Sequence, residues 1–288
     1  MNIKRKISWK ASLDQSDFGE LERLDKRMKE FYKLRKDYFL NIDYAGGTWI
    51  KPEHLEAQDM VSELSKFRSV LEVGCGNCAI LKHRKVNQEY YTGLDFSEEL
   101  IIENACRYPK ASFKCINDDN SFPVENEKYD CVFSHFVIEH CVFPNKFLDE
   151  CVRVLKTGGI FLLLCPDFLG TSRIASQRVG FSPGPGSEKL SKGKYIDALV
   201  TAFDNRIRIP VYSWFLRQSA KKKPRFYINT NPTCFVDPFS PDVDAVYIAF
   251  KDEIQGYLSD KIKWEELPPD LKSYSLKSSH IYIKGRKV

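Results

Sequence analysis

The sequence Val70-Leu71-Glu72-Val73-Gly74-Cys75-Gly76-Asn77-Cys78 is a short apolar strand with one acidic residue, followed directly by a glycine turn. Glycine has no Cβ and adopts backbone angles that other residues avoid, so Gly74 and Gly76 allow a ligand to lie directly on the main chain. A turn of this kind, placed where a helix begins, is typical of sites for cofactors that contain adenosine. The stretch therefore predicts a cofactor site in an α/β domain.

The glycine turn alone leaves the identity of the cofactor open. Gly74, Gly76 and Ala79 also satisfy the G-x-G-x-x-G/A pattern of dinucleotide-binding domains, with Asp95 near the spacing required for a ribose hydroxyl. An NAD-dependent oxidoreductase is therefore one interpretation. The chain shows no second dinucleotide-binding half, which counts against that class.

Five apolar runs alternate with helix-like segments, and they cover residues 69–73, 90–94, 112–116, 130–134 and 160–165. This alternation is typical of a doubly wound parallel sheet that helices cover on both faces. Ligands of such sheets bind beyond the carboxyl ends of the strands. Asp95, Asp118 and Ser134 each fall at such an end, so we expect them to converge on one crevice beside the glycine turn.

Further motifs follow the glycine turn in a fixed order. They are Tyr90 to Asp95, Ala111 to Asp118, Phe122-Pro123-Val124, Tyr129 to Ser134, Val137-Ile138-Glu139-His140, Arg153 to Gly159 and the apolar run Ile160 to Cys165. Over residues 65–168 this series resembles the class I S-adenosylmethionine-dependent methyltransferases, in particular the branch that methylates oxygen atoms of sugars and other small molecules. The resemblance implies a Rossmann-like, seven-stranded, mostly parallel sheet with S-adenosylmethionine as the cofactor.

The resemblance also implies roles for the residues of the turn. Glu72 and the backbone of Gly74, Cys75 and Gly76 would face the methionine part of the cofactor. Many members of the family have a third glycine where this chain has Cys78, so the turn departs from the common pattern at that position. Cys75 and Cys78 form a C-x-x-C pair, but no second pair completes a tetrahedral zinc site, and we interpret both as small packing residues.

The other cofactor contacts implied by the resemblance lie further along the chain. Asp95 would accept hydrogen bonds from both ribose hydroxyls, because a carboxylate offers acceptors to two adjacent donors at once. Asp118 would meet the adenine amino group, with Asp119 close by. Phe96 and Ser134 complete the expected cofactor-binding set.

Methyl transfer from a sulfonium needs little from the protein beyond placement of the acceptor and a base for its proton. His140 and Asp167 follow the fourth and fifth strands, and in related metal-independent sugar O-methyltransferases a histidine and an acid at these places help to activate the hydroxyl. His135 is the reserve candidate. Related quinone O-methyltransferases carry a further acid where this chain has Phe136, so a divalent site would be incomplete and we expect no metal.

Composition limits the classes of protein that fit. The chain has 288 residues, 43% of them hydrophobic, which is enough for a sizeable core. Nine cysteines without an amino-terminal signal peptide favour reduced thiols and a cytoplasmic location. No apolar run approaches the ~20 residues that span a bilayer. The net charge of +5 is small for a nucleic-acid binder, but it is compatible with anionic substrates such as nucleotide-linked sugars.

We divide the chain into four parts. Residues 1–50 form a helical extension and lid, 51–167 the S-adenosylmethionine-binding core, 168–243 a substrate cap, and 244–288 the strands and helix that complete the sheet. In the extension, residues 14–40 carry an apolar stripe at helical spacing. The candidate lid residues are Tyr44, Gly46, Gly47 and Trp49.

Within the cap, residues 192–206 are typical of a helix and residues 207–236 mix aromatic with basic side chains, without regular pattern. Long insertions of this kind in a compact domain are commonly functional. Residues 244–250 and 280–284 are two further apolar runs, which we expect to be the last two strands of the sheet.

We therefore expect a methyltransferase that acts on a small-molecule acceptor, with an oxygen of a sugar or another metabolite as the target. One alternative is a non-catalytic subunit that binds S-adenosylmethionine and activates or scaffolds a partner enzyme. An RNA methyltransferase and an NAD-dependent oxidoreductase are weaker alternatives.

Overall fold

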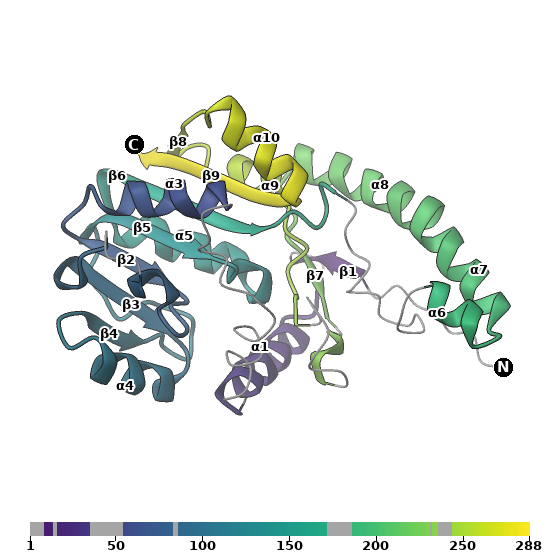
Figure 1. Cartoon of the computed structure of the whole chain (residues 1–288), viewed down its shortest axis with the longest axis horizontal. Helices are drawn as coiled ribbons and strands as arrows, with labels where there is room; N and C mark the ends of the chain where they lie inside the picture. The colour runs from purple at the N-terminus through teal and green to yellow at the C-terminus, as the bar shows by residue number, and fades with distance from the viewer. Residues whose placement is uncertain are drawn as a thin grey trace.

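The computed structural model describes residues 9–13, 16–34, 54–82, 86–171, 186–230, 232–235 and 244–288. At its centre lies a seven-stranded sheet in the order β4-β3-β2-β5-β6-β9-β8 (Figure 1). The strands are β2 (Val70–Val73), β3 (Tyr91–Asp95), β4 (Ser112–Cys115), β5 (Tyr129–His135), β6 (Leu155–Pro166), β8 (Ile262–Trp264) and β9 (His280–Lys287). β9 pairs antiparallel with β6 and β8, and the other pairs are parallel. The predicted seven-stranded, mostly parallel Rossmann-like sheet is confirmed.

Helices cover both faces of this sheet. They are α1 (Phe18–Leu34), α3 (Leu55–Leu64), α4 (Glu98–Arg107), α5 (Pro144–Val154), α9 (Lys251–Tyr257) and α10 (Pro269–Ser278). Because side chains alternate along each strand, Leu163 packs in one buried cluster with α1, α5 and α9, whereas Leu162 packs in another with α3, α4 and α10. The strands are therefore apolar on both faces, as the sequence indicated.

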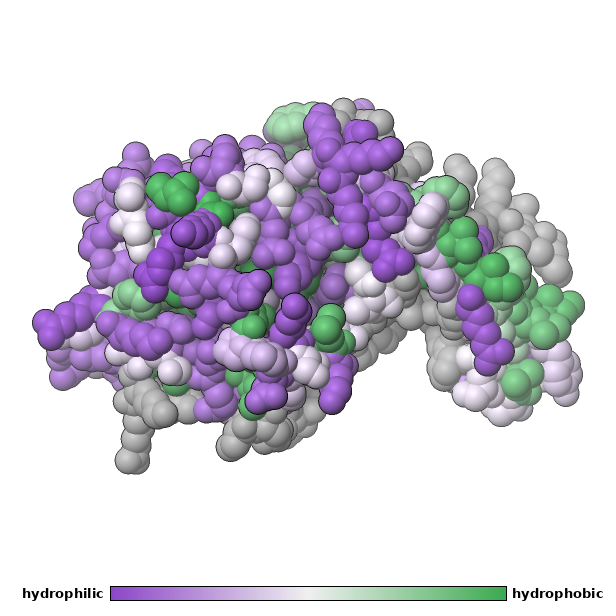
Figure 2. Space-filling view, turned by 90° about the horizontal axis from the view of Figure 1, so that it is seen from above, coloured by the Kyte–Doolittle hydropathy of each residue, from purple (hydrophilic) through white to green (hydrophobic). Residues whose placement is uncertain are grey.

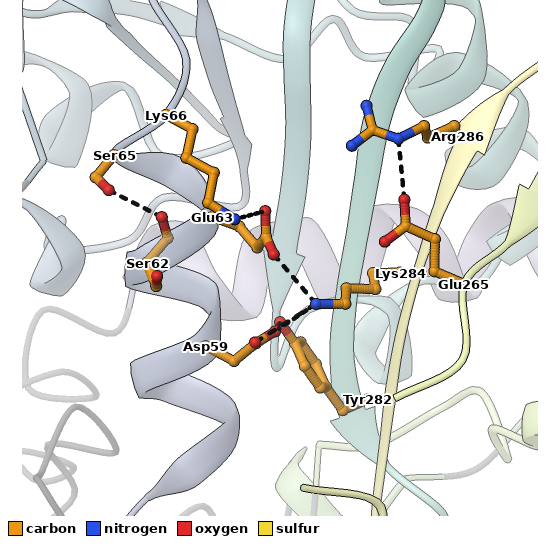
Figure 3. A network of polar contacts seen from close by, with 9 residues as sticks. All are labelled: Asp59, Ser62, Glu63, Ser65, Lys66, Glu265, Tyr282, Lys284 and Arg286. Carbon is orange, nitrogen blue, oxygen red and sulfur yellow. Dashed lines mark hydrogen bonds and ion pairs between the residues drawn. The ribbon is translucent and has the colours of Figure 1, made fainter. Parts of the chain in front are cut away.

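Helix α3 is joined to β9 by a partly buried ionic network (Figure 3). The Nζ of Lys284 lies 3.1 Å from Oε1 of Glu63 and 3.2 Å from Oδ2 of Asp59, which also accepts a hydrogen bond from the Tyr282 hydroxyl. Burial alone would lower the pKa of Lys284, but the charges of Asp59 and Glu63 raise it above its ordinary value. The network fixes a helix from before the glycine turn to the last strand of the chain.

The last two strands differ from the prediction. Residues 280–284 do belong to a strand, β9, but residues 244–250 are not part of the sheet; the other strand is β8, only three residues long. Residues 244–250 are fully buried beside β7 (Tyr227–Asn229), where Tyr247 forms an isolated bridge with Ile228. An apolar run signals burial, and here the run is buried beside β7 and in two hydrophobic clusters without pairing inside the seven-stranded sheet.

The predicted amino-terminal helix is present as α1, and Leu21, Leu24, Met28 and Phe31 form its buried stripe. Before it, β1 (Trp9–Ser12) pairs antiparallel with β7. The candidate lid residues Tyr44, Gly46, Gly47 and Trp49 lie outside the described residues.

The described part of the 168–243 insertion is more regular than expected. It contains α6 (Gly186–Ser191), α7 (Tyr195–Phe203), a π-helical turn (Asp204–Arg208) and α8 (Ile209–Lys222). The single helix expected over 192–206 begins only after Gly193, and helical structure continues to Lys222 through a segment predicted to lack regular pattern. Figure 1 shows α7 and α8 extending away from the sheet as an arm. The four-part division of the chain remains a prediction.

Candidate functional site

Strand β2 lies where the strand order reverses, with the parallel strands β3 and β5 on its two sides. In open α/β sheets, ligands bind outside the carboxyl ends of the strands at this point. The glycine turn begins here and is tied to β3, because the backbone N–H groups of Gly74 and Cys75 donate to the Leu94 carbonyl at 2.8 and 2.9 Å. The turn therefore lies where the sequence placed it.

The backbone of the turn is left-handed at three positions. The φ angles are +76° at Gly74, +48° at Gly76 and +55° at Cys78. Only glycine adopts such angles without steric cost, which accounts for the frequent third glycine of the family at the position of Cys78. Within the described residues, the helix expected after the turn is a single 3₁₀ turn, η2 (Ala79–Lys82).

Gly74 is also required for reasons of space. A Cβ placed on Gly74 would lie 2.4 Å from Cγ2 of Val137 and 2.6 Å from its Cγ1. Val137 follows β5, so the turns after two neighbouring strands are in close contact at this point. Any larger residue at position 74 would push these two turns apart.

The Asp95 carboxylate is held at the carboxyl end of β3 by main-chain donors. Its Oδ2 accepts from the Gly76 N–H at 2.9 Å and its Oδ1 from the Ser97 N–H at 3.0 Å. Asn104 fixes the other side of the turn by donating to the Gly76 carbonyl at 2.7 Å. Burial raises the pKa of Asp95, and the hydrogen bonds from Ser97 and Gly76 act in the opposite direction. Asp95 and the glycine turn are thus one rigid unit.

Glu72 is fully buried and has two side-chain partners. The Tyr91 hydroxyl donates to its Oε2, and Nδ1 of His135 lies 3.1 Å from its Oε1. Burial and the neighbouring Glu72 charge raise the pKa of Tyr91 well above its ordinary value, so Tyr91 stays a neutral donor. Glu72 therefore links β2, β3 and β5 beneath the turn. His135, the reserve catalytic candidate, is part of this link.

Cys75 and Cys78 are buried free thiols. A hydrogen bond with Cys78 and burial raise the pKa of Cys75 well above its ordinary value, which opposes formation of the thiolate that metal binding and redox chemistry need. Gly93 provides the space for Cys75, since a Cβ there would lie 2.9 Å from the Cys75 Sγ. Among the described residues, no group of three or more His, Cys, Asp or Glu is arranged to hold a metal ion.

The remaining predicted cofactor residues have different environments. The Ser134 hydroxyl is buried and donates to the Val73 carbonyl at 2.8 Å, directly before the turn. Phe96 lies next to Asp95, with Nζ of Lys29 from α1 5.1 Å from its ring centre. Asp118 and Asp119 are exposed in the loop after β4.

Helix α1 contacts this loop, because Nζ of Lys29 donates to the Asp118 carbonyl at 2.6 Å. The Asp119 side chain accepts from the N–H and hydroxyl of Ser121, and these bonds lower its pKa. Asp95, Phe96 and Ser134 thus border the glycine turn, whereas the Asp118 and Asp119 side chains lie on the outside of the neighbouring loop.

Comparison with known proteins agrees with this geometry. A family model described as a methyltransferase domain matches residues 71–163. A probable S-adenosylmethionine-dependent methyltransferase of Mycolicibacterium smegmatis is 32% identical over 123 residues, which are 41% of this chain and 41% of that protein. The chain carries a class I S-adenosylmethionine-dependent methyltransferase domain.

Two further proteins are similar to this chain. A malonyl-[acyl-carrier protein] O-methyltransferase of Enterobacter lignolyticus is 28% identical over 120 residues, 41% of this chain and 47% of that protein. The chain thus spans less than half the length of these curated relatives. A solved structure from Pyrococcus horikoshii aligns over 90% of this chain and 99% of its own, with 14% identity and a TM-score of 0.48.

His140, the predicted base, closes a short 3₁₀ turn after β5, η4 (Ile138–His140). Its Nδ1 lies 3.5 Å from Oδ2 of Asp244 and 3.3 Å from the Asp244 carbonyl, and the same Oδ2 accepts from the Tyr32 hydroxyl at 2.8 Å. The rings of Tyr32 and His140 meet edge to face, 5.7 Å apart. His140 therefore forms a cluster with a buried acid from beyond the arm and a tyrosine from α1.

Asp167 follows β6 and has other partners. Its Oδ1 accepts from the Gly170 N–H at 2.8 Å, and its own N–H donates to the Ser279 carbonyl at 2.8 Å. Burial raises its pKa to about 6, and the nearby Asp252 charge acts in the same direction. The acids that contact His140 in the structure are Asp244, 3.5 Å from its Nδ1, and Glu139, 3.8 Å from its Nε2, and neither was selected as a site residue from the sequence.

Asp244, Tyr32 and Val137 were all missed as site residues. Asp244 directly precedes the apolar run 245–250, which was assigned to the sheet and so removed from consideration. Tyr32 lies beside the buried stripe of α1. Its contact with His140 depends on how α1 packs over the loops after the strands, which the sequence pattern does not show. Val137 has no chemical signal at all; its role is steric.

Proposed function

We propose that this methyltransferase domain transfers the methyl group of S-adenosylmethionine to an oxygen atom of a small molecule, with a sugar or nucleotide-linked sugar as the expected acceptor class. The observation that carries the proposal is the rigid unit of Asp95 and the glycine turn at the reversal of strand order. The Enterobacter relative is an O-methyltransferase, which supports oxygen as the target atom.

The residues of the turn fit the cofactor. Main-chain donors from Gly76 and Ser97 fix the Asp95 carboxylate, and a carboxylate has about four acceptor sites, which leaves capacity for the two hydroxyls of a ribose. Ser134, Phe96 and Asp118 are the further candidates for contacts with the cofactor. Glu72, held by Tyr91 and His135, would act by supporting the turn beneath the methionine part.

The sulfonium supplies an activated methyl group, so the protein has to align the acceptor and remove one proton. We propose that His140 is the base that accepts this proton. Asp244 lies 3.5 Å from Nδ1 and Oε1 of Glu139 lies 3.8 Å from Nε2, and we propose Nε2, whose acidic neighbour is the more distant, as the nitrogen that takes the proton. Asp244 and Tyr32 are positioning residues in this proposal, and Asp167 is a second acid available to an acceptor hydroxyl.

A cytoplasmic location remains part of the proposal. It rests on the nine cysteines, all of which are free thiols in the structure. None of the helices in the described residues is long and apolar enough to cross a membrane.

The test is transfer of a labelled methyl group from S-adenosylmethionine to a panel of sugars, nucleotide-linked sugars and carboxylic acids. With an accepted substrate, His140→Gln should lower kcat by about 10²- to 10⁴-fold, the usual contribution of a general base. Asp244→Asn should lower kcat less and shift its pH profile, while the cofactor affinity of both variants stays unchanged. His54→Gln, which removes a histidine that contacts Tyr274, is the matched control.

Full activity of His140→Gln would contradict the assignment of the base. Tight binding of S-adenosylmethionine without transfer to any member of the panel would instead favour the non-catalytic scaffold.

A further inference from the structure

Among the described residues, the arm formed by α6, α7 and α8 packs on the core mainly through α8. Ile209 and Ala220 of α8 pack in a buried cluster with Phe168 and Ile248, and Nη1 of Arg217 donates to the Gly170 carbonyl at 2.7 Å. In contrast, the buried apolar side chains of α7 are limited to Ala198 among the described residues. The outer part of the arm therefore contributes little to the hydrophobic core.

The arm carries a concentrated exposed apolar surface. Of the fourteen large hydrophobic side chains that are exposed among the described residues, nine lie on the arm: Leu190, Tyr195, Ile196, Leu199, Phe203, Ile207, Val211, Trp214 and Phe215. Each of them is at least 50% exposed. Figure 2 shows this cluster in green on the projecting part of the molecule. We call these nine residues the arm stripe.

The π-helical turn helps to keep the arm stripe on one side. Six of its members, from Tyr195 to Phe215, recur at every fourth position. In an uninterrupted α-helix each four-residue step advances about 40° past a full turn, so the two ends would diverge by about 200°. The wider π-helical turn at Asp204–Arg208 advances less per residue and offsets part of that rotation. The stripe therefore winds less around the arm than it would on an uninterrupted α-helix.

The charge of the protein is concentrated on the same arm. Residues 186–223 contain nine Lys or Arg and three Asp or Glu, a net charge of +6, whereas the whole chain carries +5. The rest of the chain taken together is thus almost neutral. Exposed basic residues lie near both ends and the middle of the stripe, and they include Lys194, Arg206 and Lys222.

We propose that the arm binds an anionic lipid surface, with the arm stripe inserted at the level of the headgroups and its basic residues on the surrounding phosphates. Helices of this kind, with Lys and Arg beside an apolar face that includes Trp and Phe, lie in the plane of a membrane interface. Trp214 and Tyr195 suit that level because they combine an apolar ring with a polar tip.

Other partners fit the arm less well. Aliphatic members of the stripe, such as Leu199 and Val211, have no stacking role on nucleic-acid bases. A second copy of the chain would bring two arms of charge +6 together, and like charges oppose such a contact. A convex apolar helix suits a soft lipid surface, which adapts to it without a preformed groove. Binding to lipid does not depend on the methyl-transfer reaction.

The test is flotation of the full chain with vesicles of phosphatidylcholine alone or of phosphatidylcholine with phosphatidylserine. We expect flotation with the anionic vesicles only, weakened by added salt. Leu199→Gln and Phe215→Gln should each lower the partition about tenfold, because each removes a large apolar side chain from the inserted face. Arg206→Gln and Lys222→Gln should each lower it about fivefold. All four residues are exposed, so the fold tolerates these changes.

The controls are Leu276→Gln, which changes a leucine of α10 that is 72% exposed against 70% for Leu199, and Lys272→Gln on the same helix. Neither should affect flotation. The fluorescence of Trp214, identified with Trp214→Phe, should be quenched by brominated lipid in anionic vesicles. The proposal is overturned by absence of flotation, by equal flotation with neutral vesicles, or by loss of binding in the controls. Light scattering that shows a dimer dependent on Leu199, without lipid binding, would overturn it in favour of a second copy.

Discussion

Gly74 is a residue for which conformation and space act together. Its φ of +76° is costly for any other residue, by roughly 1–2 kcal/mol, and its missing Cβ leaves room for Val137. We predict that Gly74→Ala lowers the free energy of unfolding by about 2–4 kcal/mol through the sum of conformational strain and overpacking. Urea unfolding of the variant measures this loss.

Val137→Ala separates the two causes. It removes both Cγ atoms and leaves the Val137 Cβ at 3.1 Å, so most of the steric part of the Gly74→Ala loss should disappear in the double variant while the cost of the left-handed backbone remains. The double variant should therefore be more stable than the sum of the single losses indicates, by at least about 1 kcal/mol. Strict additivity would show that Val137 does not press on the turn.

Asp167 should make stability depend on pH. Its pKa in the folded protein is about 6, against an ordinary value of 3.8, so the folded state binds more protons than the unfolded state between these values. Wild-type stability is therefore lost as pH rises from about 4 to about 7. Asp167→Asn keeps an acceptor for the Gly170 N–H but has no charge, and it should remove this part of the dependence.

The measurement is the free energy of unfolding of wild type and Asp167→Asn at about pH 4 and about pH 8. At the higher pH the free energy of unfolding of the variant should rise relative to that of wild type, by at most about 3 kcal/mol. Partial exposure of the carboxyl group makes the gain smaller than this limit. An equal difference at both values would mean that Asp167 titrates normally.

At the scale of elements, the link between α3 and β9 depends on Lys284. Its side chain is 9% exposed, and those of its partners Glu63 and Asp59 are 11% and 23% exposed. Lys284→Met would leave two carboxylates close together without their cation, so we expect a loss of about 2–4 kcal/mol. Arg286→Gln on the same strand breaks a half-exposed pair with Glu265 and should cost at most about 1 kcal/mol. Similar losses in both variants, measured by thermal unfolding, would contradict this difference.

Most of the strands that the sequence identified are buried on both faces, and the exception is the edge strand β4, whose residues are exposed or half-buried. Leu71 and Phe133 lie in continuous apolar runs because helices cover both sides of the sheet, and such runs are visible without a structure. β8 was missed because it has only three residues, of which Lys263 is exposed. Residues 244–250 were misassigned because burial beside β7 leaves the same apolar pattern as burial in the seven-stranded sheet.

Arm helix α8 was missed for a different reason. Only Ile209, Ser213 and Ala220 of α8 are buried, with Tyr212 and Leu216 half-buried against the same cluster, while Trp214 and Phe215 are exposed. The helical period of apolar residues, which normally reports the core, is therefore masked by apolar residues on the outside. Exposed apolar residues that bind a partner outside the chain, as proposed for the arm stripe, would obscure the helical pattern of α8.

At the scale of the whole molecule, the predicted cofactor residues and the proposed base differ in how far the sequence predicts their surroundings. Asp95 and the glycine turn are neighbours because parallel strands end at one edge, so the sheet pattern alone predicts their approach. His140 and Asp244 are separated by the arm in the sequence. Their contact depends on where a buried loop returns, and no local pattern records that.

The central claim, that the crevice beside the glycine turn binds S-adenosylmethionine, is tested most directly by calorimetric titration. The ligands are S-adenosylmethionine, S-adenosylhomocysteine and NAD, each titrated into wild type and into Asp95→Ala. We predict micromolar binding of both adenosyl ligands by wild type, no binding of NAD, and a loss of about 1–3 kcal/mol in Asp95→Ala, because a charged acceptor is removed from the ribose. Binding of NAD alone, or adenosyl affinity unchanged in Asp95→Ala, would contradict the account.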